Sequence, residues 1–303
     1  RGITMVAIIE RMSAPLISET AFWAACAAEL AQSLGALAAQ EVLPRFAHAQ
    51  ISTKSDGSLL SDADLAVQQA LPALLKSIYP APLLGEEMPA DIQTALWNSC
   101  LNGKGALWIA DPIDGTTNFA HGLPWFAISV ALIHQGVTVL GATVAPALQQ
   151  SWHASLGGGS YCNDARLTLS TEPRRLKECV MGVDMTYLPA PLRQQIASIS
   201  PAGIANGKAQ TAPWRGWRSL GASTLEWCAL ASGQVNAYVH GGQMPWDAAA
   251  GRLILAEAGG HSDNLPQVLG HPSHNELLSP IGYAAAAPGV WDIWQQWLRD
   301  QAG

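Results

Sequence analysis

Acidic residues stand beside apolar segments at three places in this 303-residue chain. Asp111 and Asp114 follow the hydrophobic run Leu-Trp-Ile-Ala, Glu86 and Glu87 end another apolar stretch, and Asp247 opens a third. Carboxylates at the edge of buried sequence are costly unless they are paired or bind a metal. Oxygen ligands without His or Cys are those that a hard cation such as Mg²⁺ prefers. The three segments therefore predict a magnesium site.

The residues around the paired aspartates suit an anionic ligand. Pro112 is expected to stiffen a turn between the two carboxylates, and Gly115 permits tight backbone geometry. Thr116 and Thr117 then begin a predicted helical turn, whose free N–H groups can accept a phosphate. Bound cations and such a turn would together attract an anionic substrate to a chain that is itself acidic.

Each segment also has a purely structural interpretation. Asp247 alone is explained as a helix N-cap, and Glu86-Glu87 alone as a solvated loop.

The glycine cluster 157–159 lacks the following Gly-Lys-Ser/Thr of a phosphate loop, so we interpret it as a turn. Three histidines have no spacing typical of a metal site or a catalytic triad and are interpreted as structural or surface residues: His121, His134 and His153.

Two amphipathic helices are expected before the first acidic segment. Residues 18–43 carry apolar side chains at helical spacing and end near Pro44. Ser61-Asp-Ala-Asp64 predicts the start of a second helix, with acids in its first turn. The apolar faces are predicted as Phe22, Cys26, Leu30, Leu34 and Leu37 in the first helix, and Leu65, Leu71, Leu74, Leu75 and Ile78 in the second.

The middle of the chain is predicted to form strands. Residues 107–110, 126–133 and 137–144 are β-branched and bounded by turns, and the last two are joined by a tight turn at 134–136. No Asp, Glu, Lys or Arg lies between Asp114 and Asp164. Glycine, proline and histidine interrupt this stretch too often for a membrane span, so consecutive buried strands are the preferred interpretation.

The second half alternates strands with helices, which predicts an α/β layer. The expected strands are 180–183, 217–220 and 235–239, and the expected helices are 223–232 and 247–258, the latter closed by Gly259-Gly260. A boundary near 170–180 divides the chain into an N-terminal α+β half, 1–175, with most of the acidic motifs, and a C-terminal α/β half, 176–303.

Composition restricts the class of protein. Hydrophobic residues make up 49% and charged residues 13% of the chain, with a net charge of −7 and a pI near 5.6. Without a dense basic run, a nucleic-acid partner is not expected.

The five scattered cysteines indicate buried thiols in a reducing cytoplasm. The stretch Met5–Ile9 is too short for a signal sequence, and Met5 or Met12 is an expected initiator.

Together, the acidic segments resemble the signature segments of the inositol monophosphatase family. The resemblance lies in Gly-Glu86-Glu87, Trp-Ile-Ala-Asp111-Pro-Ile-Asp114-Gly-Thr-Thr-Asn-Phe and Trp-Asp247-Ala-Ala-Ala-Gly, and extends to Lys54-Ser-Asp-Gly-Ser, Gly122-Leu-Pro-Trp and Arg218-Ser-Leu-Gly-Ala-Ser223. It covers roughly residues 20–290. It implies a layered α/β/α/β/α fold of the mixed α/β class, a homodimer, and two or three Mg²⁺ ions between the halves.

The same resemblance implies a role for each matching residue. Glu86, Asp111 and the carbonyl of Ile113 would hold the first Mg²⁺, and Asp111, Asp114 and Asp247 the second. Thr116, backed by Asp64, would orient the attacking water, while the amides of Gly115 and Thr116 bind the phosphate. Lys54 would lie on a loop near the site, and Ser223 and His240 would contact the substrate.

One position departs from the family pattern. Members that act on inositol phosphates commonly carry an acid seven residues before the last metal-binding aspartate, where this chain has His240. An imidazole cannot replace a carboxylate acceptor without changing the preferred substrate. A second phosphate or a base on the substrate would suit it, and a loop histidine without ligand contact is the alternative.

The predicted activity is Mg²⁺-dependent hydrolysis of a small phosphate monoester, similar to inositol monophosphate. A nucleotide 3′(2′),5′-bisphosphatase and a sugar-bisphosphatase of the same superfamily remain alternatives. So does an interaction protein that keeps the fold without the activity. Neither a membrane nor a nucleic acid is an expected partner.

Overall fold

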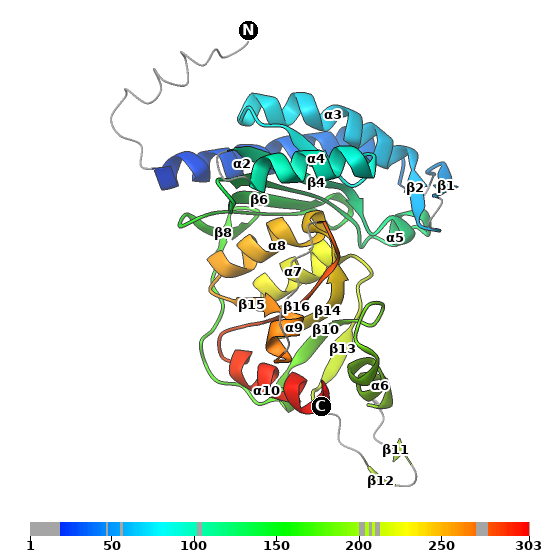
Figure 1. Ribbon diagram of the computed structural model, residues 1–303, viewed down its shortest axis with the longest axis vertical. Helices are drawn as coiled ribbons and strands as arrows, with labels where there is room; N and C mark the ends of the chain where they lie inside the picture. Colours follow the sequence, from blue (N-terminus) through cyan, green and yellow to red (C-terminus); the bar gives the residue numbers. More distant parts are fainter. Residues whose placement is uncertain are drawn as a thin grey trace.

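The computed structural model describes residues 19–46, 48–54, 57–101, 105–199, 204–205, 208–209, 213–270 and 278–302. They form five layers in the order helices, sheet, helices, sheet, helices (Figure 1). The predicted α/β/α/β/α arrangement is therefore confirmed. The expected start sites Met5 and Met12 lie outside the described residues.

The first sheet has seven strands in the order β3-β4-β5-β6-β7-β8-β9. Only β3 and β4 pair in parallel among these neighbours; the other pairs are antiparallel. The predicted tight turn between β5 and β6 is confirmed, since Gln135 and Gly136 adopt φ of 52° and 79°. The strands are β3 (Leu83–Gly85), β4 (Ala106–Asp114), β5 (Ala127–His134), β6 (Val137–Ala145), β7 (Gln150–Ser155), β8 (Gly159–Cys162) and β9 (Ala165–Leu167).

The second sheet has the order β13-β10-β14-β16-β15, and begins after the chain leaves the first sheet at Leu167. Because β10 pairs in parallel with both β13 and β14, the carboxyl ends of these three strands meet at one edge. The strands are β10 (Val180–Asp184), β13 (Gly216–Arg218), β14 (Ala237–Gln243), β15 (His261–Asn264) and β16 (Ile281–Ala286).

Helices α7 (Ser223–Ala231) and α8 (Pro245–Glu257) form the middle layer and join the two sheets through one apolar core. The close approach of α8 to β6 requires glycine at position 141. A Cβ atom there would lie 2.8 Å from the Cα of Ala250. Two small residues thus fix how near α8 lies to the first sheet.

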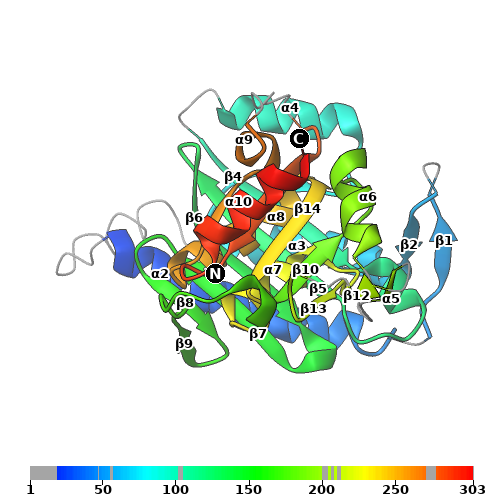
Figure 2. The same cartoon turned by 90° about the horizontal axis from the view of Figure 1, so that it is seen from below.

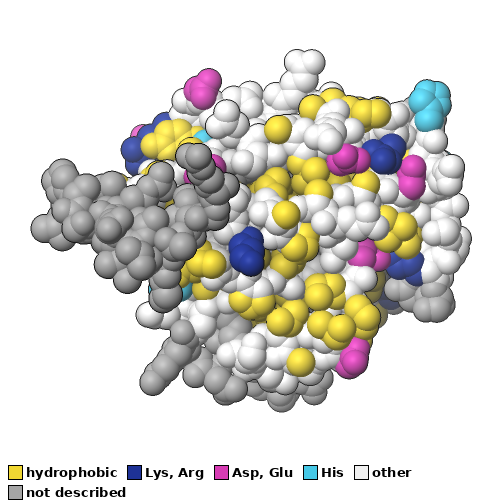
Figure 3. All heavy atoms as spheres, turned by 90° about the horizontal axis from the view of Figure 1, so that it is seen from above, with side chains coloured by type: hydrophobic (Ala, Val, Ile, Leu, Met, Phe, Trp, Pro, Cys, Tyr) yellow, Lys and Arg dark blue, Asp and Glu magenta, His cyan; other side chains and the backbone are white. Residues whose placement is uncertain are grey.

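The outer layer above the first sheet consists of α2 (Glu19–Leu37), α3 (Asp62–Ile78) and α4 (Ala90–Leu101). Hydrophobic side chains are also scattered over its outward face (Figure 3). Phe22 and Leu65 are 38% and 46% exposed, so their predicted places on the apolar faces are wrong. In α2 the neighbouring Trp23 is buried instead, whereas Cys26, Leu30, Leu34 and Leu37 are buried as predicted. The predicted phase of the helix is therefore right, and only its first turn differs.

A stretch of 24 residues, Glu19–Val42, comprises α2 and the following π-helical turn Ala38–Val42. Its length and composition would allow it to cross a membrane. The buried helix of a soluble protein and a signal sequence meet the same two criteria. In this fold it packs on β6 and β7, and Leu30 and Leu34 are fully buried. The charge-free stretch after Asp114 forms strands, as expected.

The opposite outer layer covers the second sheet with α6 (Ala190–Ser198), α9 (Leu265–Val268) and α10 (Trp291–Ala302), as seen from below (Figure 2). Of the elements predicted in this half, the strand at 217–220 ends two residues early, at Arg218. The strand at 235–239 is shifted and runs to Gln243. His240 therefore lies in a strand and not in a loop.

The glycine cluster at 157–159 is a turn between β7 and β8, which confirms its interpretation. Its N–H groups already have an anionic partner. The carboxylate of Glu257, at the end of α8, accepts from Gly157 at 2.7 Å and from Gly159 at 2.9 Å. None of the four cysteines with described side chains forms a disulfide, and Cys26, Cys179 and Cys228 are buried.

Candidate active site

The paired aspartates lie at the carboxyl end of β4. The predicted turn at Pro112 is wrong, since β4 continues through it to Asp114. Proline is tolerated there because the register of β4 with β5 is irregular between Asp111 and Asp114. The irregularity separates two environments: Asp111 is buried, whereas Asp114 is partly exposed.

Gly115 allows the chain to leave β4 and start helix α5 (Thr116–Ala120) at once. It adopts φ of 83°, and a Cβ atom there would lie 2.7 Å from the carbonyl oxygen of Trp125. The predicted helical turn is thus confirmed, with the hydroxyl of Thr116 donating to the carbonyl of Ile113 at 2.9 Å. That carbonyl is one of the expected metal ligands.

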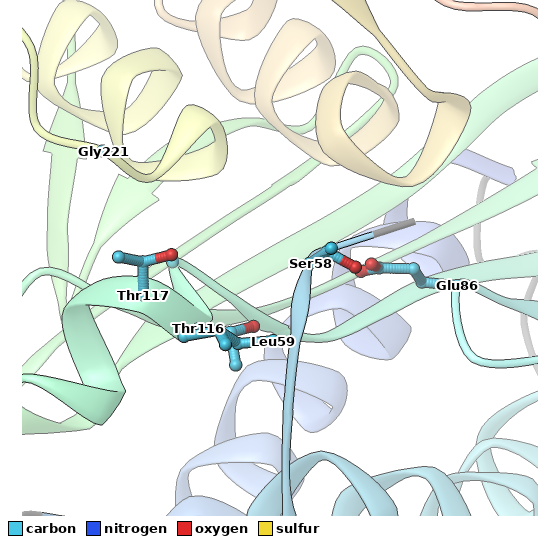
Figure 4. A pocket seen from close by; sticks show the side chains of 8 residues that line it. Ser58, Leu59, Glu86, Thr116, Thr117 and Gly221 are labelled. Carbon is cyan, nitrogen blue, oxygen red and sulfur yellow. The ribbon is translucent and has the colours of Figure 1, made fainter. Parts of the chain in front are cut away.

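A pocket of about 230 Å³ opens beside this turn. In Figure 4 the side chains of Ser58 and Glu86 point toward one another, across the pocket from Thr116 and Thr117. Residues 57–59, at the start of β2 (Leu59–Ser61), which pairs with β1 (Ile51–Thr53), form one wall, and the loop before α7 forms another. The lining residues are Gly57, Ser58, Leu59, Glu86, Gly115, Thr116, Thr117 and Gly221.

Lys54 lies next to the acidic pair that follows β3. Its Nζ atom lies 3.1 Å from Glu86 Oε1 and 2.5 Å from Glu87 Oε1. Burial alone would lower the pKa of Lys54, but the hydrogen bond to Glu87 and the charges of both glutamates raise it. Lys54 is therefore a permanent cation on an expected metal ligand.

Asp64 is held at the start of α3 by the predicted N-terminal motif. Its Oδ2 accepts from the N–H of Ser61 at 2.8 Å and from the Ser61 hydroxyl at 2.5 Å, and the Asp64 N–H returns a bond to that hydroxyl. Burial raises the pKa of Asp64 to about 6. Within the described part of the chain it makes no hydrogen bond to Thr116, the residue it was expected to support.

The second half contributes Asp247 from the first turn of α8. The N-cap interpretation of Asp247 is wrong: Met244 is the N-cap, and Asp247 stands at the third helical position. Its Oδ2 accepts from the Met244 N–H at 2.8 Å. The start of the helix thus fixes the Oδ2 atom of Asp247, and Oδ1 takes no part in this bond.

Asp114 is joined to the second half by α7. Its Oδ2 accepts 2.6 Å hydrogen bonds from both the N–H and the hydroxyl of Thr224. Ser223, the expected substrate contact, is the residue before Thr224 and is partly exposed. The two aspartates of β4 and Asp247 therefore meet at the junction of the halves.

The carboxylates interact electrostatically. Burial, followed by the charges of Glu86, Asp114, Asp247 and Asp64, raises the pKa of Asp111 far above its ordinary value. The pKa of Asp247 is raised by burial and by Asp114, and that of Asp114 by burial despite the bonds from Thr224. Without a cation, this site holds protons more tightly than isolated carboxylates do.

A metal ion fits the donor chemistry of this site. All the candidate side-chain ligands are carboxylates, and Asp111 Oδ1 is buried without a hydrogen-bond partner in the structure. Yet in the described ranges no group of three or more His, Cys, Asp or Glu side chains is arranged to hold an ion. Glu86 points to Lys54 and Asp114 Oδ2 to Thr224, so the ligands must draw together when an ion enters.

His240 lies at the edge where the parallel strands end. Its Nδ1 accepts from the Gly242 N–H at 3.0 Å, which places the ring proton on Nε2, 3.9 Å from Asp184 Oδ2. Asp184 stands opposite His240 in the register of β10 and β14. Burial lowers the pKa of His240, although Asp184 opposes that shift. The imidazole is therefore neutral at pH 7.

Two residues near the site were not identified from the sequence. Thr224 contacts Asp114, and the buried Glu226 accepts from the Leu220 N–H at 2.6 Å. Burial raises the pKa of Glu226 to about 7. The signal was present, because Glu226 is the only acid between Asp184 and Asp247 and sits in an apolar helix.

Comparison with known proteins gives the chain a family. A "Putative Nus factor SuhB" from Neisseria meningitidis serogroup B is 35% identical over 211 residues, which cover 69% of this chain and 74% of that protein. An inositol-1-monophosphatase from Mesorhizobium japonicum is 33% identical over 222 residues, covering 70% and 74%.

A solved structure agrees in fold. The extragenic suppressor protein suhB of Bartonella henselae is 26% identical, with a TM-score of 0.70 over 91% of this chain and 98% of that one. The sequence model of the inositol monophosphatase family matches residues 20–285. The chain belongs to the inositol monophosphatase family and is a hydrolase of phosphate monoesters.

Proposed function

We propose that this phosphatase requires Mg²⁺ and acts on a small monoester similar to inositol monophosphate. The observation that carries the proposal is the unpartnered, buried Oδ1 of Asp111, surrounded by the charges of other carboxylates. A buried anion without a partner is strongly destabilising. A hard cation at this point would satisfy that oxygen and offset the mutual repulsion of the acids.

The ligands would come from both halves of the chain. Glu86, Asp111 and the Ile113 carbonyl would hold one ion, and Asp111, Asp114 and Asp247 a second. Bound Mg²⁺ supplies positive charge for the phosphate oxygens and lowers the pKa of a coordinated water. Glu86 must exchange Lys54 for the ion, and Glu87 remains as the partner of the Lys54 ammonium.

The other pocket residues would bind and orient the phosphate group. Gly115 and Thr116 line the pocket, and their N–H groups would donate to phosphate oxygens. The Thr116 hydroxyl would orient the attacking water, with Asp64 as a nearby proton acceptor. Asp64, whose pKa is raised to about 6, is mostly ionised at pH 7 and protonates in mildly acidic solution.

The surroundings of His240 favour a leaving group without a second phosphate. A neutral imidazole beside Asp184 offers one N–H donor and one anionic acceptor, a pair that suits a hydroxyl group. A second phosphate would instead meet the Asp184 carboxylate without a compensating cation on His240. Between the alternatives, this favours a hydroxyl-bearing monophosphate over a bisphosphate.

A non-enzymatic role is the second candidate. One relative is named a putative Nus factor, so an interaction role is a proposal for this chain as well. It predicts a partner complex that persists when Asp111 is replaced and phosphate release is lost.

A panel of phosphate monoesters, assayed with and without Mg²⁺, tests the proposed function. The panel contains inositol monophosphate, a sugar bisphosphate and adenosine 3′,5′-bisphosphate. We expect phosphate release that disappears in EDTA and is fastest with inositol monophosphate. Equal release in EDTA would contradict the metal requirement, and a faster bisphosphate would contradict the substrate class.

A further inference from the structure

Asp114 receives two hydrogen bonds from a single residue of the other half of the chain. The backbone N–H and the Oγ1 hydroxyl of Thr224 both lie 2.6 Å from Asp114 Oδ2. Thr224 is fully buried near the start of α7, and 110 positions separate the two residues. The contact therefore depends on the packing of α7 against the first sheet.

The two donors restrict the carboxylate in different ways. The N–H belongs to the first turn of α7, where free N–H groups donate to any nearby anion, so this bond alone is an ordinary helix cap. The Thr224 hydroxyl donates to the same oxygen from a second direction. Two donors on one oxygen, with backbone N–H groups of Ser223 and Gly115 also acting on the carboxylate, hold its plane against rotation and fix the direction in which it faces an ion.

We propose that Thr224 is a positioning residue, whose hydroxyl orients the Asp114 carboxylate for metal binding. The inference rests on the proposed function, because it takes Asp114 to be a ligand of Mg²⁺. Hydrogen-bond partners behind a metal ligand typically change metal affinity by about 10- to 100-fold. Loss of the hydroxyl should therefore weaken Mg²⁺ binding by that factor.

The substitution Thr224→Val tests the hydroxyl alone. Valine has nearly the same shape and keeps the backbone N–H, so the helix cap on Asp114 remains. Thr224→Ser restores a hydroxyl without the methyl group. Thr143→Val is the matched control, because Thr143 is also fully buried and its Oγ1 lies 3.4 Å from the hydroxyl of Ser129.

Isothermal titration calorimetry of each metal-free protein with Mg²⁺ gives the affinity, and melting temperature without metal reports the fold. We expect Thr224→Val to bind Mg²⁺ about 10- to 100-fold more weakly than wild type. Thr224→Ser should remain within about threefold, and Thr143→Val should be unchanged. Turnover in Thr224→Val should recover as Mg²⁺ is raised, since the defect lies in metal binding.

Three results would overturn the inference. Wild-type affinity in Thr224→Val would show that the hydroxyl does not orient Asp114. Equal weakening in Thr224→Ser, which keeps the hydroxyl, would assign the effect to altered packing at this position. A wild-type protein that binds no Mg²⁺ would remove the metal requirement of the proposed function, and this inference with it.

Discussion

The ammonium of Lys54 lies 3.1 Å from Glu86 Oε1, on a carboxylate of the proposed Mg²⁺ site. A cation at this point stabilises the acidic site without metal, and we expect it to compete with Mg²⁺ for Glu86. Half-exposed ion pairs of this kind contribute about 1 kcal/mol. In the absence of metal, the Lys54 ammonium therefore offsets part of the negative charge of the site.

Replacing Lys54 with Gln should lower the Mg²⁺ concentration needed for half-maximal thermal stabilisation, by about three- to tenfold. The variant removes the competing charge and leaves Glu86 in place. Lys76→Gln, which makes the same charge change at an exposed site in α3, is the control. A higher Mg²⁺ requirement in Lys54→Gln would show that Lys54 assists binding of the ion.

Asp111→Asn should reduce kcat at least about 1,000-fold, equivalent to about 4 kcal/mol of barrier. It should also raise the melting temperature in EDTA, because it removes a buried carboxyl group whose raised pKa lowers the stability of the folded protein at neutral pH. Millimolar Mg²⁺ should stabilise wild type and not the variant, since an ion that binds only the folded state shifts unfolding by mass action.

Thermal melts and phosphate release, each with Mg²⁺ and with EDTA, check both effects of Asp111→Asn. Asp91→Asn on the exposed face of α4 should match wild type in every condition. A variant that keeps a tenth of the wild-type kcat would exclude Asp111 as a metal ligand.

Glu226 should make the metal-free protein less stable as pH rises. Its pKa is about 7 in the folded protein, against an ordinary value of 4.5, so the folded state binds the extra proton between these values. The free energy of unfolding therefore falls as pH rises through this window, by roughly 3 kcal/mol. Glu226→Gln keeps an acceptor for the Leu220 N–H and removes the titration.

Urea unfolding of metal-free protein at pH 5 and pH 8 measures this contribution. The difference between the two pH values should shrink in Glu226→Gln, with the variant more stable than wild type at pH 8. Glu172→Gln, at an exposed position, should leave the difference unchanged. If the free energy of unfolding depends on pH in the same way in wild type and Glu226→Gln, Glu226 has the same pKa in the folded and unfolded protein.

Asp184→Asn should raise kcat/KM for a sugar bisphosphate relative to inositol monophosphate, by about fivefold to tenfold. The change removes the negative charge near His240 and retains the oxygen that accepts the Thr186 N–H at 2.7 Å. One such polar contact is commonly worth about 1 kcal/mol. Asp164→Asn is the control. If Asp184→Asn leaves the ratio of the two kcat/KM values unchanged, Asp184 lies outside the substrate site.

The sequence predicted the parts of the site that lie within single motifs. The Asp111–Asp114 string, the Ser61–Asp64 helix start and the helical turn at Thr116 depend on neighbouring residues, whose geometry is local. The bond from Thr224 to Asp114 could not be predicted, because packing brings together residues 110 positions apart. Phe22 was misplaced for another reason: it lies at the edge of the buried face of α2, where adjacent apolar residues such as Trp23 compete for the buried position.

The contact of Gly141 with Ala250 has a consequence for the choice of ion. It sets the separation of α8, which carries Asp247, from the sheet that carries Asp111 and Asp114. Ala250→Val would push the helix outward and widen the space between these carboxylates, although no ligand changes. Mg²⁺ requires short, nearly octahedral bonds, whereas Ca²⁺ accepts longer and more variable ones. We therefore expect these two apolar residues to influence the ionic radius that the proposed site accepts.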